Sequence, residues 1–369
     1  MRLTLVISTL GPGGAERVMS RLADAWAKRG DQVTLITLDG STGGFFPLAP
    51  AVTRLALPVP ASVEGNFRKL RLLFGLLRQV FELRRTIAHT KPDLVISFID
   101  SVNVMVLAAL LGTRTPRIVS ERSDPAMVPL PAFWKLMRGL FYPSADKIVV
   151  QTEGAARFFD EQPDRVAIIA NPVERPPETE VDFELRRPAV VALGRFTEEK
   201  RFVDLLDAFA QVASRNPNWT LIIAGDGPLR PDLTEKVTAL GLQDRVLMPG
   251  LVANAAALLR QADIFVLSSR FEGFPNALCE AMALGRPVIA TDCPSGPRAI
   301  VRPDVDGVLV PPMQPKALAA ALDRLMSAPE ERGRLGATAI SILERFSLDR
   351  ILGEWDRVAT AAMGAHAKP

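Results

Sequence analysis

Histidine and cysteine are scarce in this 369-residue sequence, and their scarcity argues against several kinds of site. Only two histidines occur, His89 and His366, and His366 lies in the tail beside the last residues. Histidine-rich metal centres and Ser-His-Asp triads are therefore disfavoured, because each would have to be built from His89. The two cysteines, Cys279 and Cys293, are too few for a disulfide framework, so we expect a reducing, cytoplasmic setting.

Long apolar runs are also lacking. The run from Val102 to Leu111 is far shorter than the ~20 apolar residues that span a bilayer. The apolar start, residues 1–10, lacks the basic n-region and the small-residue cleavage site of a secretory signal, and a glycine-rich turn follows at once. We therefore expect a buried first strand and no transmembrane segment.

What the sequence does contain is a globular balance, with 48% hydrophobic and 23% charged residues. Its length suits two domains of ordinary size. Short apolar runs alternate with helical patterns throughout, which predicts α/β layers with parallel sheets. The predicted strands are 3–9, 32–38, 94–98, 117–120 and 147–151 in the first half, and 189–193, 221–224, 246–248, 264–267 and 288–291 in the second.

A change in composition separates these halves. Residues 173–188 are rich in proline and charge, which is typical of an interdomain linker. Each half begins with a strand, a glycine turn and a helix, so residues 1–172 and residues 189–347 are predicted to form two Rossmann-like domains. Ligands of this fold bind at the carboxyl ends of the strands, and we expect a ligand between the two halves.

The first glycine turn, residues 11–16, lies between a predicted strand and a predicted helix. Backbone amides at such a helix start attract phosphate groups. The turn is not a Walker A loop, since no Gly-Lys-Ser/Thr follows, and it is a poor dinucleotide fingerprint, since Arg17 stands where a third glycine is needed. A plain tight turn explains these glycines equally well.

Two cations follow the first predicted strand of the second half. Arg195 comes directly after Gly194, and Lys200 follows five residues later. Their side chains can grip a diphosphate through charge-assisted hydrogen bonds. The alternative is a solvated helix start in which Glu198 and Glu199 pair with these bases.

The strongest signal is the segment 271–280, Phe-Glu-Gly-Phe-Pro-Asn-Ala-Leu-Cys-Glu, which leads from a predicted strand into a helix. Glu272 precedes the helix and can accept hydrogen bonds from sugar hydroxyls. Glu280 lies about one turn inside the helix and can bind both hydroxyls of a ribose. The alternative is a pair of capping or solvated glutamates, which the apolar neighbours of Glu280 disfavour.

Glu272 and Glu280, with seven residues between them, resemble the E-x7-E signature of the retaining glycosyltransferases of family 4. The similarity continues in the right order through 13–17, 194–200, 224–229 and 285–290. It implies a GT-B fold, in which two Rossmann-like domains face each other across a cleft. Residues 1–172 would bind the acceptor, residues 189–347 the nucleotide sugar, and a C-terminal helix within 348–369 would pack back on the first domain.

The resemblance also implies roles for individual residues. Glu280 resembles the ribose ligand, Glu272 the partner of the transferred sugar, and Arg195 with Lys200 the clamp that stabilises the leaving nucleotide diphosphate. The remaining donor-binding positions would be Gly13, Gly14, Gly273, Phe274, Pro275, Asn276 and Leu278. The family reacts with retention by a front-face route, so it needs no paired hydrolase carboxylates. It usually needs no metal or other cofactor, and no Asp-x-Asp motif is evident.

One departure from the family concerns a histidine that commonly lies near the transferred sugar. Residues 120–124 read Ser-Glu-Arg-Ser-Asp, so Arg122 occupies the place of that histidine. Arginine is always protonated and cannot act as a general base, but it can act as an electrostatic clamp. On this ground Arg122 is counted among the catalytic candidates.

Two further segments, 96–104 and 120–123, are similar to one branch of the family. That branch contains the amylovoran-type galactosyltransferases and the GalNAc transferases of bacterial N-glycan assembly. It implies a UDP-hexose or UDP-N-acetylhexosamine donor and a polyprenyl-diphosphate-linked acceptor. The expected enzyme is a retaining hexosyltransferase of bacterial cell-surface polysaccharide or glycan assembly.

A basic helical pattern supports an anionic partner. On a helix its bases gather on one side, and they are Arg68, Arg71, Arg78 and Arg85. Such a helix suits an anionic membrane surface or a diphosphate head group, and in the GalNAc transferases a basic helix in this place contacts the acceptor's diphosphate. The alternative is a solvated cationic face on a core helix. Nucleic acid fits poorly, since few aromatic residues interleave the bases. We expect a peripheral protein at the inner face of the plasma membrane.

Three other functions fit the sequence less well. The first is a GDP-sugar (mannosyl) transferase of the same fold, and only the resemblance to one branch of the family favours a UDP-sugar donor over a GDP-sugar donor. A nucleotide-sugar epimerase or hydrolase is expected to carry acid–base side chains in its cleft, and histidine is nearly absent. An inactive membrane-bound scaffold would not need Glu272, Glu280, Arg195 and Lys200.

Overall fold

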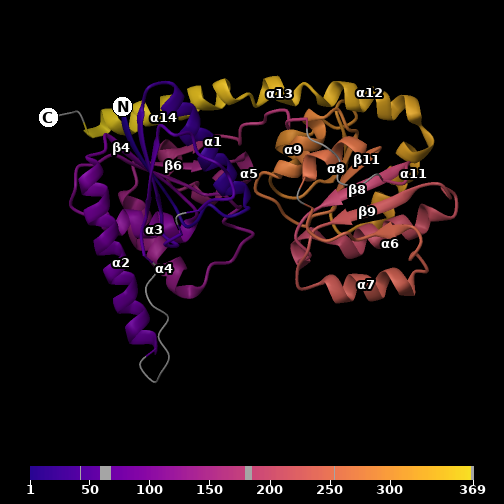
Figure 1. Cartoon of the computed structure of the whole chain (residues 1–369), viewed down its shortest axis with the longest axis horizontal. Coiled ribbons are helices and arrows are strands. Elements are labelled where there is room, and N and C mark those ends of the chain that lie inside the picture. The colour runs from indigo at the N-terminus through magenta and orange to yellow at the C-terminus, as the bar shows by residue number, and fades with distance from the viewer. Residues whose placement is uncertain (42, 59–67, 179–184, 253, 367–369) are drawn as a thin grey trace. The chain divides into compact units, whose positions relative to one another are not determined.

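The computed structural model describes the chain except residues 42, 59–67, 179–184, 253 and 367–369, and it describes residues 68–73 by their backbone alone. It divides into two compact units (Figure 1). Unit 1 comprises Met1–Ala170 and Asp349–Pro369, and unit 2 comprises Asn171–Leu348. The predicted linker, 173–188, falls within unit 2, and part of it lies outside the described residues.

Unit 1 is built on a seven-stranded sheet with the order β3-β2-β1-β4-β5-β6-β7. Every pair of neighbouring strands is parallel, so the chain must cross over between them, mostly through helices. The strands are β1 (Arg2–Ile7), β2 (Gln32–Thr37), β3 (Val52–Ala56), β4 (Leu94–Phe98), β5 (Arg117–Ser120), β6 (Lys147–Val150) and β7 (Val166–Ile168).

Amphipathic helices cover the sheet of unit 1. On the first helix Val18, Met19, Leu22 and Trp26 are buried, and their spacing places them on one face. The helices are α1 (Gly14–Lys28), α2 (Arg68–Thr90), α3 (Asp100–Ala109), α4 (Ala132–Phe141), α5 (Glu153–Ala156) and α14 (Leu348–His366), with short 3-10 turns η1 (Tyr142–Ser144), η2 (Arg157–Phe159) and η3 (Pro163–Arg165).

The helix α14 completes the core of unit 1 with an aromatic side chain from the far end of the chain. Trp355 is 1% exposed and packs edge-on against Trp26, with ring centroids 6.2 Å apart. It also stacks on Phe98 of β4 at 5.9 Å. A sheet residue, a residue of α1 and a residue of α14 therefore meet in one aromatic cluster.

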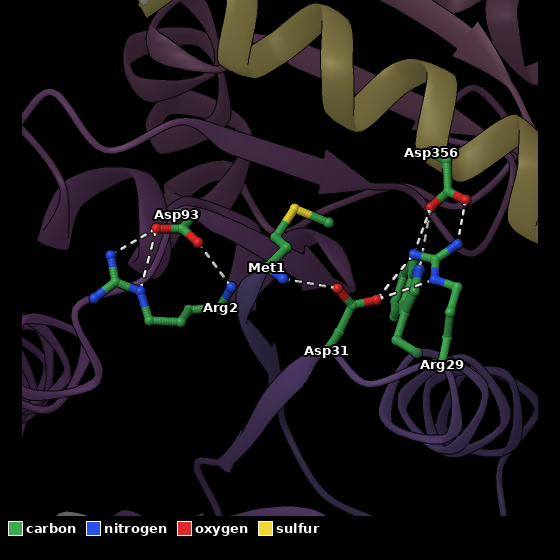
Figure 2. A network of polar contacts seen from close by, with 7 residues as sticks. Met1, Arg2, Arg29, Asp31, Asp93 and Asp356 are labelled. Atoms are coloured by element: carbon green, nitrogen blue, oxygen red, sulfur yellow. Dashed lines mark hydrogen bonds and ion pairs between the residues drawn. The ribbon is translucent and has the colours of Figure 1, made fainter.

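Ion pairs and hydrogen bonds at the surface of unit 1 connect the start of β1 and the end of α1 to neighbouring segments. Figure 2 shows Arg29, at the end of α1, between Asp31 and Asp356 of α14. The hydrogen bonds that Arg29 donates to Asp356 raise the pKa of Arg29 above its ordinary value. Arg2 donates to Asp93 from its guanidinium at 2.6 Å and from its backbone N–H at 2.8 Å. These bonds connect β1 to the residue that directly precedes β4. Such partly exposed pairs contribute little stability, but they fix where α14 lies against α1.

Unit 2 repeats the plan with a six-stranded parallel sheet in the order β10-β9-β8-β11-β12-β13. Its strands are β8 (Ala189–Leu193), β9 (Thr220–Ala224), β10 (Val246–Leu247), β11 (Ile264–Leu267), β12 (Val288–Thr291) and β13 (Val308–Val310). Its helices are η4 (Glu198–Lys200), α6 (Phe202–Ala213), α7 (Arg230–Ala239), α8 (Ala255–Gln261), α9 (Asn276–Ala283), α10 (Pro297–Ile300), α11 (Pro315–Ser327), α12 (Pro329–Ala339) and α13 (Ile342–Arg345). The predicted α/β class with two Rossmann-like domains is confirmed.

In each sheet the strand order reverses at one place, between β1 and β4 in unit 1 and between β8 and β11 in unit 2. At such a switch point the two connections leave toward opposite faces, and ligands bind outside the carboxyl ends of the strands. The glycine turn 11–14 follows β1, the Gly194 turn follows β8, and the loop with Glu272 follows β11. The two glycine turns and Glu272 therefore lie at the positions that this fold uses for ligands.

Trp355→Ala is expected to lower the free energy of unfolding of unit 1 by about 3–5 kcal/mol, because the substitution leaves a cavity beside Trp26 and Phe98. Differential scanning calorimetry measures the change. Arg357→Ala, at an exposed position of the same helix, is the matched control and should change the stability by less than about 0.5 kcal/mol. Equal unfolding temperatures for Trp355→Ala and the unaltered protein would contradict the prediction.

Candidate active site

The switch point of unit 2 brings two of the predicted residues into direct contact. Lys200, at the end of η4, donates from Nζ to Glu272 Oε1 at 2.6 Å, and both side chains are largely buried. Ser269 Oγ donates to the same carboxylate oxygen at 2.6 Å. An ammonium group has three N–H donors, so Lys200 retains donors for a second anion while it holds Glu272.

The loops that carry this ion pair are tied to one another. Ser268 Oγ donates to the backbone carbonyl of Lys200 at 2.7 Å. Ser295 Oγ, in the loop after β12, donates to the backbone carbonyl of Glu272 at 2.7 Å. The loops after β8, β11 and β12 are therefore joined at the carboxyl edge of the sheet, and the backbone fixes the geometry of the pair.

Two glycines of the loop after β9 allow a close approach to the Gly194 turn. Gly225 and Gly227 have φ of +145° and +158°. A Cβ on Gly225 would lie 1.8 Å from the carbonyl oxygen of Gly194, and a Cβ on Gly227 would lie 2.6 Å from that of Phe196. Only glycine fits at these two positions, so the loops after β8 and β9 pack backbone against backbone.

Arg195 and Glu280 are not members of the Lys200–Glu272 ion pair. Arg195 is exposed, and its side chain makes no hydrogen bond or ion pair with any residue in the described part of the chain. Glu280 is half-buried and lies on α9, one helical turn or more from the Glu272 loop. The ion pair thus unites two of the four predicted charged residues, and Arg195 remains available to an anion.

The other predicted positions of this segment serve mainly to pack the start of α9. Phe274 is 7% exposed and meets Phe346 edge-on at 5.5 Å. Leu278 is fully buried in the core, so its side chain cannot reach a ligand. Asn276 Oδ1 accepts a hydrogen bond from Asn171 Nδ2 at 2.9 Å. Pro275 is buried at the N-cap of α9, and Gly273 precedes it, so these residues offer a ligand mainly their backbone.

The switch point of unit 1 carries the first glycine turn. Gly13 is the N-cap of α1, Gly14 is its first residue, and Gly13 N donates to Gly11 O at 2.9 Å. The side chain of Glu16 folds back over this turn, because a Cβ on Gly13 would lie 2.0 Å from Glu16 Oε2. A carboxylate therefore lies where helix amides and the helix dipole favour an anion, and a phosphate would compete with it.

Arg122 lies next to the same turn. Its Cζ is 4.3 Å from the centroid of the Phe98 ring, a cation–π distance, and its Nη1 donates to Ser120 Oγ at 3.3 Å. Burial lowers the pKa of Arg122 to about 9, and the negative charge of Glu16 opposes that shift. The guanidinium stays charged at neutral pH, and the carboxylate that acts on it belongs to the glycine turn.

A buried polar network beside Arg122 has no counterpart among the sequence predictions. Ser97 Oγ donates to Asn103 Oδ1 at 2.7 Å, Asn103 Nδ2 donates to the hydroxyl of Tyr142 at 3.1 Å, and that hydroxyl donates to Glu121. Burial raises the pKa of Glu121 to about 7, and burial together with Glu121 raises the pKa of Tyr142 well above its ordinary value. The available signal was the polar residues that interrupt the apolar segments 94–98 and 100–109.

The predicted basic helix is present as α2. Arg78 and Arg85 are exposed, whereas Arg84 donates to two backbone carbonyls at the end of α3, both at 2.8 Å. The side chains of Arg68 and Arg71 lie outside the part of the chain that the structure describes.

Large apolar side chains are exposed beside these cations. Both α2 and α4 pack against α3, and Figure 1 shows the three helices side by side. The name α2–α4 surface is used below for the following exposed side chains of α2 and α4: Phe74, Leu77, Arg78, Phe81, Arg85, Phe133, Lys135, Leu136 and Leu140. Among the described residues, no helix is both long and apolar enough to cross a membrane.

The described ranges of the chain contain no cluster of histidine, cysteine, aspartate or glutamate side chains that would form a metal site. These ranges hold no group of three or more His, Cys, Asp or Glu side chains that could bind a metal ion.

Both halves of the sequence match glycosyltransferase family models. Residues 13–172 match the glycosyl transferase 4-like domain, and residues 187–328 match glycosyl transferases group 1. These two ranges contain the glycine turn and Arg122 in one case and Lys200 with Glu272 in the other.

Curated relatives and solved structures agree with these matches. The chain is 30% identical, over 96% of its length and 97% of the relative, to the GalNAc-alpha-(1->4)-GalNAc-alpha-(1->3)-diNAcBac-PP-undecaprenol alpha-1,4-N-acetyl-D-galactosaminyltransferase of Campylobacter jejuni. It is 26% identical, over 96% of its length and 98% of the relative, to the amylovoran biosynthesis glycosyltransferase AmsD of Erwinia amylovora. Its fold is similar to that of HepE from Anabaena in complex with UDP, with a TM-score of 0.78, 18% identity and coverage of 98% and 100% of the two chains.

A glycosyltransferase relative thus aligns along nearly the whole chain, and the matched ranges contain the ion pair and the glycine turn at the switch points of the two sheets. The chain belongs to the glycosyltransferases of the group 1 and 4-like family and has their two-domain GT-B type of fold.

Proposed function

We propose that this glycosyltransferase transfers a hexose or an N-acetylhexosamine from a UDP-sugar, with retention, to a polyprenyl-diphosphate-linked glycan. Unit 2 binds the donor, unit 1 binds the acceptor, and the reaction takes place at the inner face of the plasma membrane during bacterial cell-surface polysaccharide or glycan assembly. The proposal depends above all on one observation, the ion pair between Lys200 and Glu272 at the switch point of unit 2.

The chemistry of this pair suits a nucleotide diphosphate sugar. The ammonium of Lys200 directs its free donors to the diphosphate, while Glu272 accepts hydrogen bonds from hydroxyls of the transferred sugar. Arg195 is exposed and unbonded in the described part of the chain, and it adds a second, bidentate cation. Negative charge grows on the leaving diphosphate as the glycosidic bond breaks, so both cations stabilise the transition state more than the ground state.

The remaining donor contacts follow from the same placement. Glu280 binds the ribose hydroxyls, and the backbone of Gly273, Phe274 and Pro275 meets the transferred sugar. In unit 1, Gly13 and Gly14 offer amides to the phosphates, and Arg122 acts as an electrostatic clamp near the reacting sugar. UDP is favoured as the nucleotide because HepE, a structure of similar fold, binds UDP.

A lipid-linked acceptor is favoured by the relatives. The Campylobacter enzyme, which aligns with nearly the whole chain, acts on a diphospho-undecaprenol-linked glycan according to its name. The α2–α4 surface fits such an acceptor, since exposed Phe, Leu, Arg and Lys side chains are the composition of a protein face that lies on an anionic membrane.

Lys200→Ala is expected to weaken UDP binding about 10- to 100-fold, because a charge-assisted hydrogen bond contributes roughly 1.5–3 kcal/mol. Transfer from the UDP-sugar should fall at least as far, since the lost cation also stabilises the leaving diphosphate. Isothermal titration calorimetry with UDP and a transfer assay measure the two effects.

The matched control for this test is Lys236→Ala. Lys236 belongs to unit 2 and pairs with Asp207 at 2.7 Å, so it is a lysine–carboxylate pair of similar length away from the switch point. It should leave UDP affinity unchanged. Equal losses in the two variants, or no loss in Lys200→Ala, would contradict the assignment of the donor site.

The stereochemistry of the product tests the proposed retention. Lys200 and Ser269 both donate to Oε1 of Glu272, which supports a role for this carboxylate as a hydrogen-bond acceptor in place of a nucleophile. We therefore expect the leaving diphosphate itself to accept the acceptor's proton on the same face of the ring. An α-linked product from an α-configured UDP-sugar, identified by the one-bond C–H coupling of its anomeric carbon in NMR, is the expected result, and a β-linked product would refute it.

Membrane binding tests the α2–α4 surface. Replacing Arg78 and Arg85 together by glutamine should weaken binding to vesicles that contain phosphatidylglycerol by about 30-fold at low ionic strength, because each base contributes about 1 kcal/mol. Cosedimentation with these vesicles, compared with phosphatidylcholine alone, measures the effect. Replacing the exposed Arg334 and Arg357 by glutamine is the control with the same change of net charge. The surface is wrongly assigned if both pairs of substitutions act alike.

A further inference from the structure

The backbone next to Arg122 is strained. Ile99, between β4 and α3, has φ of +78°, a conformation that a β-branched residue rarely adopts. Two hydrogen bonds hold it there, from Ile99 N to Ser120 O at 3.2 Å and from Asn103 N to Ile99 O at 2.8 Å. Strain of this kind costs of order 1–3 kcal/mol and gathers at functional sites, where the surrounding structure maintains it. In this chain the hydrogen bond from Ile99 N fixes the carbonyl of Ser120, the residue that precedes Glu121 and Arg122.

Side-chain hydrogen bonds reach the same short segment from another direction. Asn103 Nδ2 donates to Ser120 O at 3.0 Å as well as to the hydroxyl of Tyr142. That hydroxyl donates to Oε1 of Glu121, whose own N–H donates to Val149 O at 2.9 Å. Ser120 and Glu121, which precede Arg122, are therefore held by hydrogen bonds from both backbone and side chains.

The donors of this network all point toward Glu121. Ser97 donates to Asn103, Asn103 donates to Tyr142, and Tyr142 donates to Glu121, which ends the chain as an acceptor. An ionised carboxylate is an acceptor only, so the order of donors matches the ionised form of Glu121. Each of these four side chains is buried, and buried networks of this kind are costly to break.

We propose that Glu121, Tyr142 and Asn103 are positioning residues for Arg122, and that Arg122 is correctly placed only while Glu121 is ionised. The proposal builds on the role of Arg122 in transfer that is proposed above. In this proposal the buried carboxylate of Glu121 controls the position of the neighbouring Arg122 through the backbone that joins the two residues.

The charges that face Glu121 set the pH at which this control operates. Burial raises its pKa to about 7, the hydrogen bond from Tyr142 of η1 opposes the shift, Asp100 of α3 adds to it, and Arg138 of α4 opposes it. Because the ionised form is the competent one, transfer should be constant above the pKa and should fall as the pH drops below it. About tenfold less enzyme is competent for each pH unit below the midpoint.

A spectroscopic test needs no activity, because Tyr142 is the only tyrosine of the chain. Protein labelled with ζ-13C-tyrosine gives one phenol resonance, and the Nε–H resonance of Arg122 can be assigned by its loss in Arg122→Lys. Both resonances should titrate with a midpoint near pH 7 in the unaltered protein and should stay constant through this range in Glu121→Gln. Tyr142→Phe should raise the midpoint reported by Arg122, because it removes a hydrogen bond that favours the carboxylate. Asp160→Asn, an exposed carboxyl of the same unit, should change nothing.

A transfer assay with the UDP-sugar then connects the network to function. The acidic limb of kcat should be present in the unaltered protein and in Asp160→Asn. In Glu121→Gln, whose side chain cannot ionise, kcat should be low at every pH and show no acidic limb, while the KM for the donor changes little. The positioning role is overturned if the Arg122 resonance still titrates in Glu121→Gln or fails to titrate in the unaltered protein. A titrating Arg122 resonance in a protein that transfers no sugar would instead overturn the proposed function and leave the coupling intact.

Discussion

The candidate site of unit 2 depends on the ion pair between Lys200 and Glu272. A buried ammonium or a buried carboxylate is costly alone, and each lowers the cost of the other. Serine hydroxyls and backbone carbonyls from the loops after β8, β11 and β12 fix the two partners, so their geometry is established by the fold. The first glutamate of the family signature is thus half of a pair whose other half comes from a different loop, 72 residues earlier in the sequence.

The same arrangement of charge recurs in the other unit in a looser form. Arg122 feels the carboxylate of Glu16, which folds over the glycine turn, just as Lys200 is held by Glu272. In each unit a cation therefore interacts with a carboxylate of the same unit, Lys200 with Glu272 and Arg122 with Glu16. Such a cation is held in place by a carboxylate of its own unit.

Much of the fold followed from sequence periodicity, because most strands are buried on both faces and read as continuous apolar runs. The strands that were missed, β3, β7 and β13, lie at or near the edges of their sheets, where burial is partial or the strand has only three residues. The switch-point loops were identified because motif residues directly follow predicted strands. Leu278 was predicted to bind the donor from its place in the motif, and because its side chain is fully buried this prediction now concerns its backbone.

The network around Glu121 could not be read from the sequence for a different reason. Glu121 and Tyr142 are separated by 21 residues, and no local pattern connects them. Their contact arises when α3 and η1 pack against the end of β5, so only the tertiary structure brings the carboxyl to its donor. Polar residues inside apolar segments indicated that some buried network exists, but they did not say which side chains would meet.

The place of Trp355 in the core of unit 1 has a consequence for biosynthesis. A ribosome makes residues 1–170 first, yet the aromatic cluster with Trp26 and Phe98 waits for a helix that emerges after all of unit 2 has been made. The unit synthesised second is therefore the first whose residues are all available for folding. Until α14 has been made, Trp26 and Phe98 of the amino-terminal segment lack the aromatic side chain on which they pack.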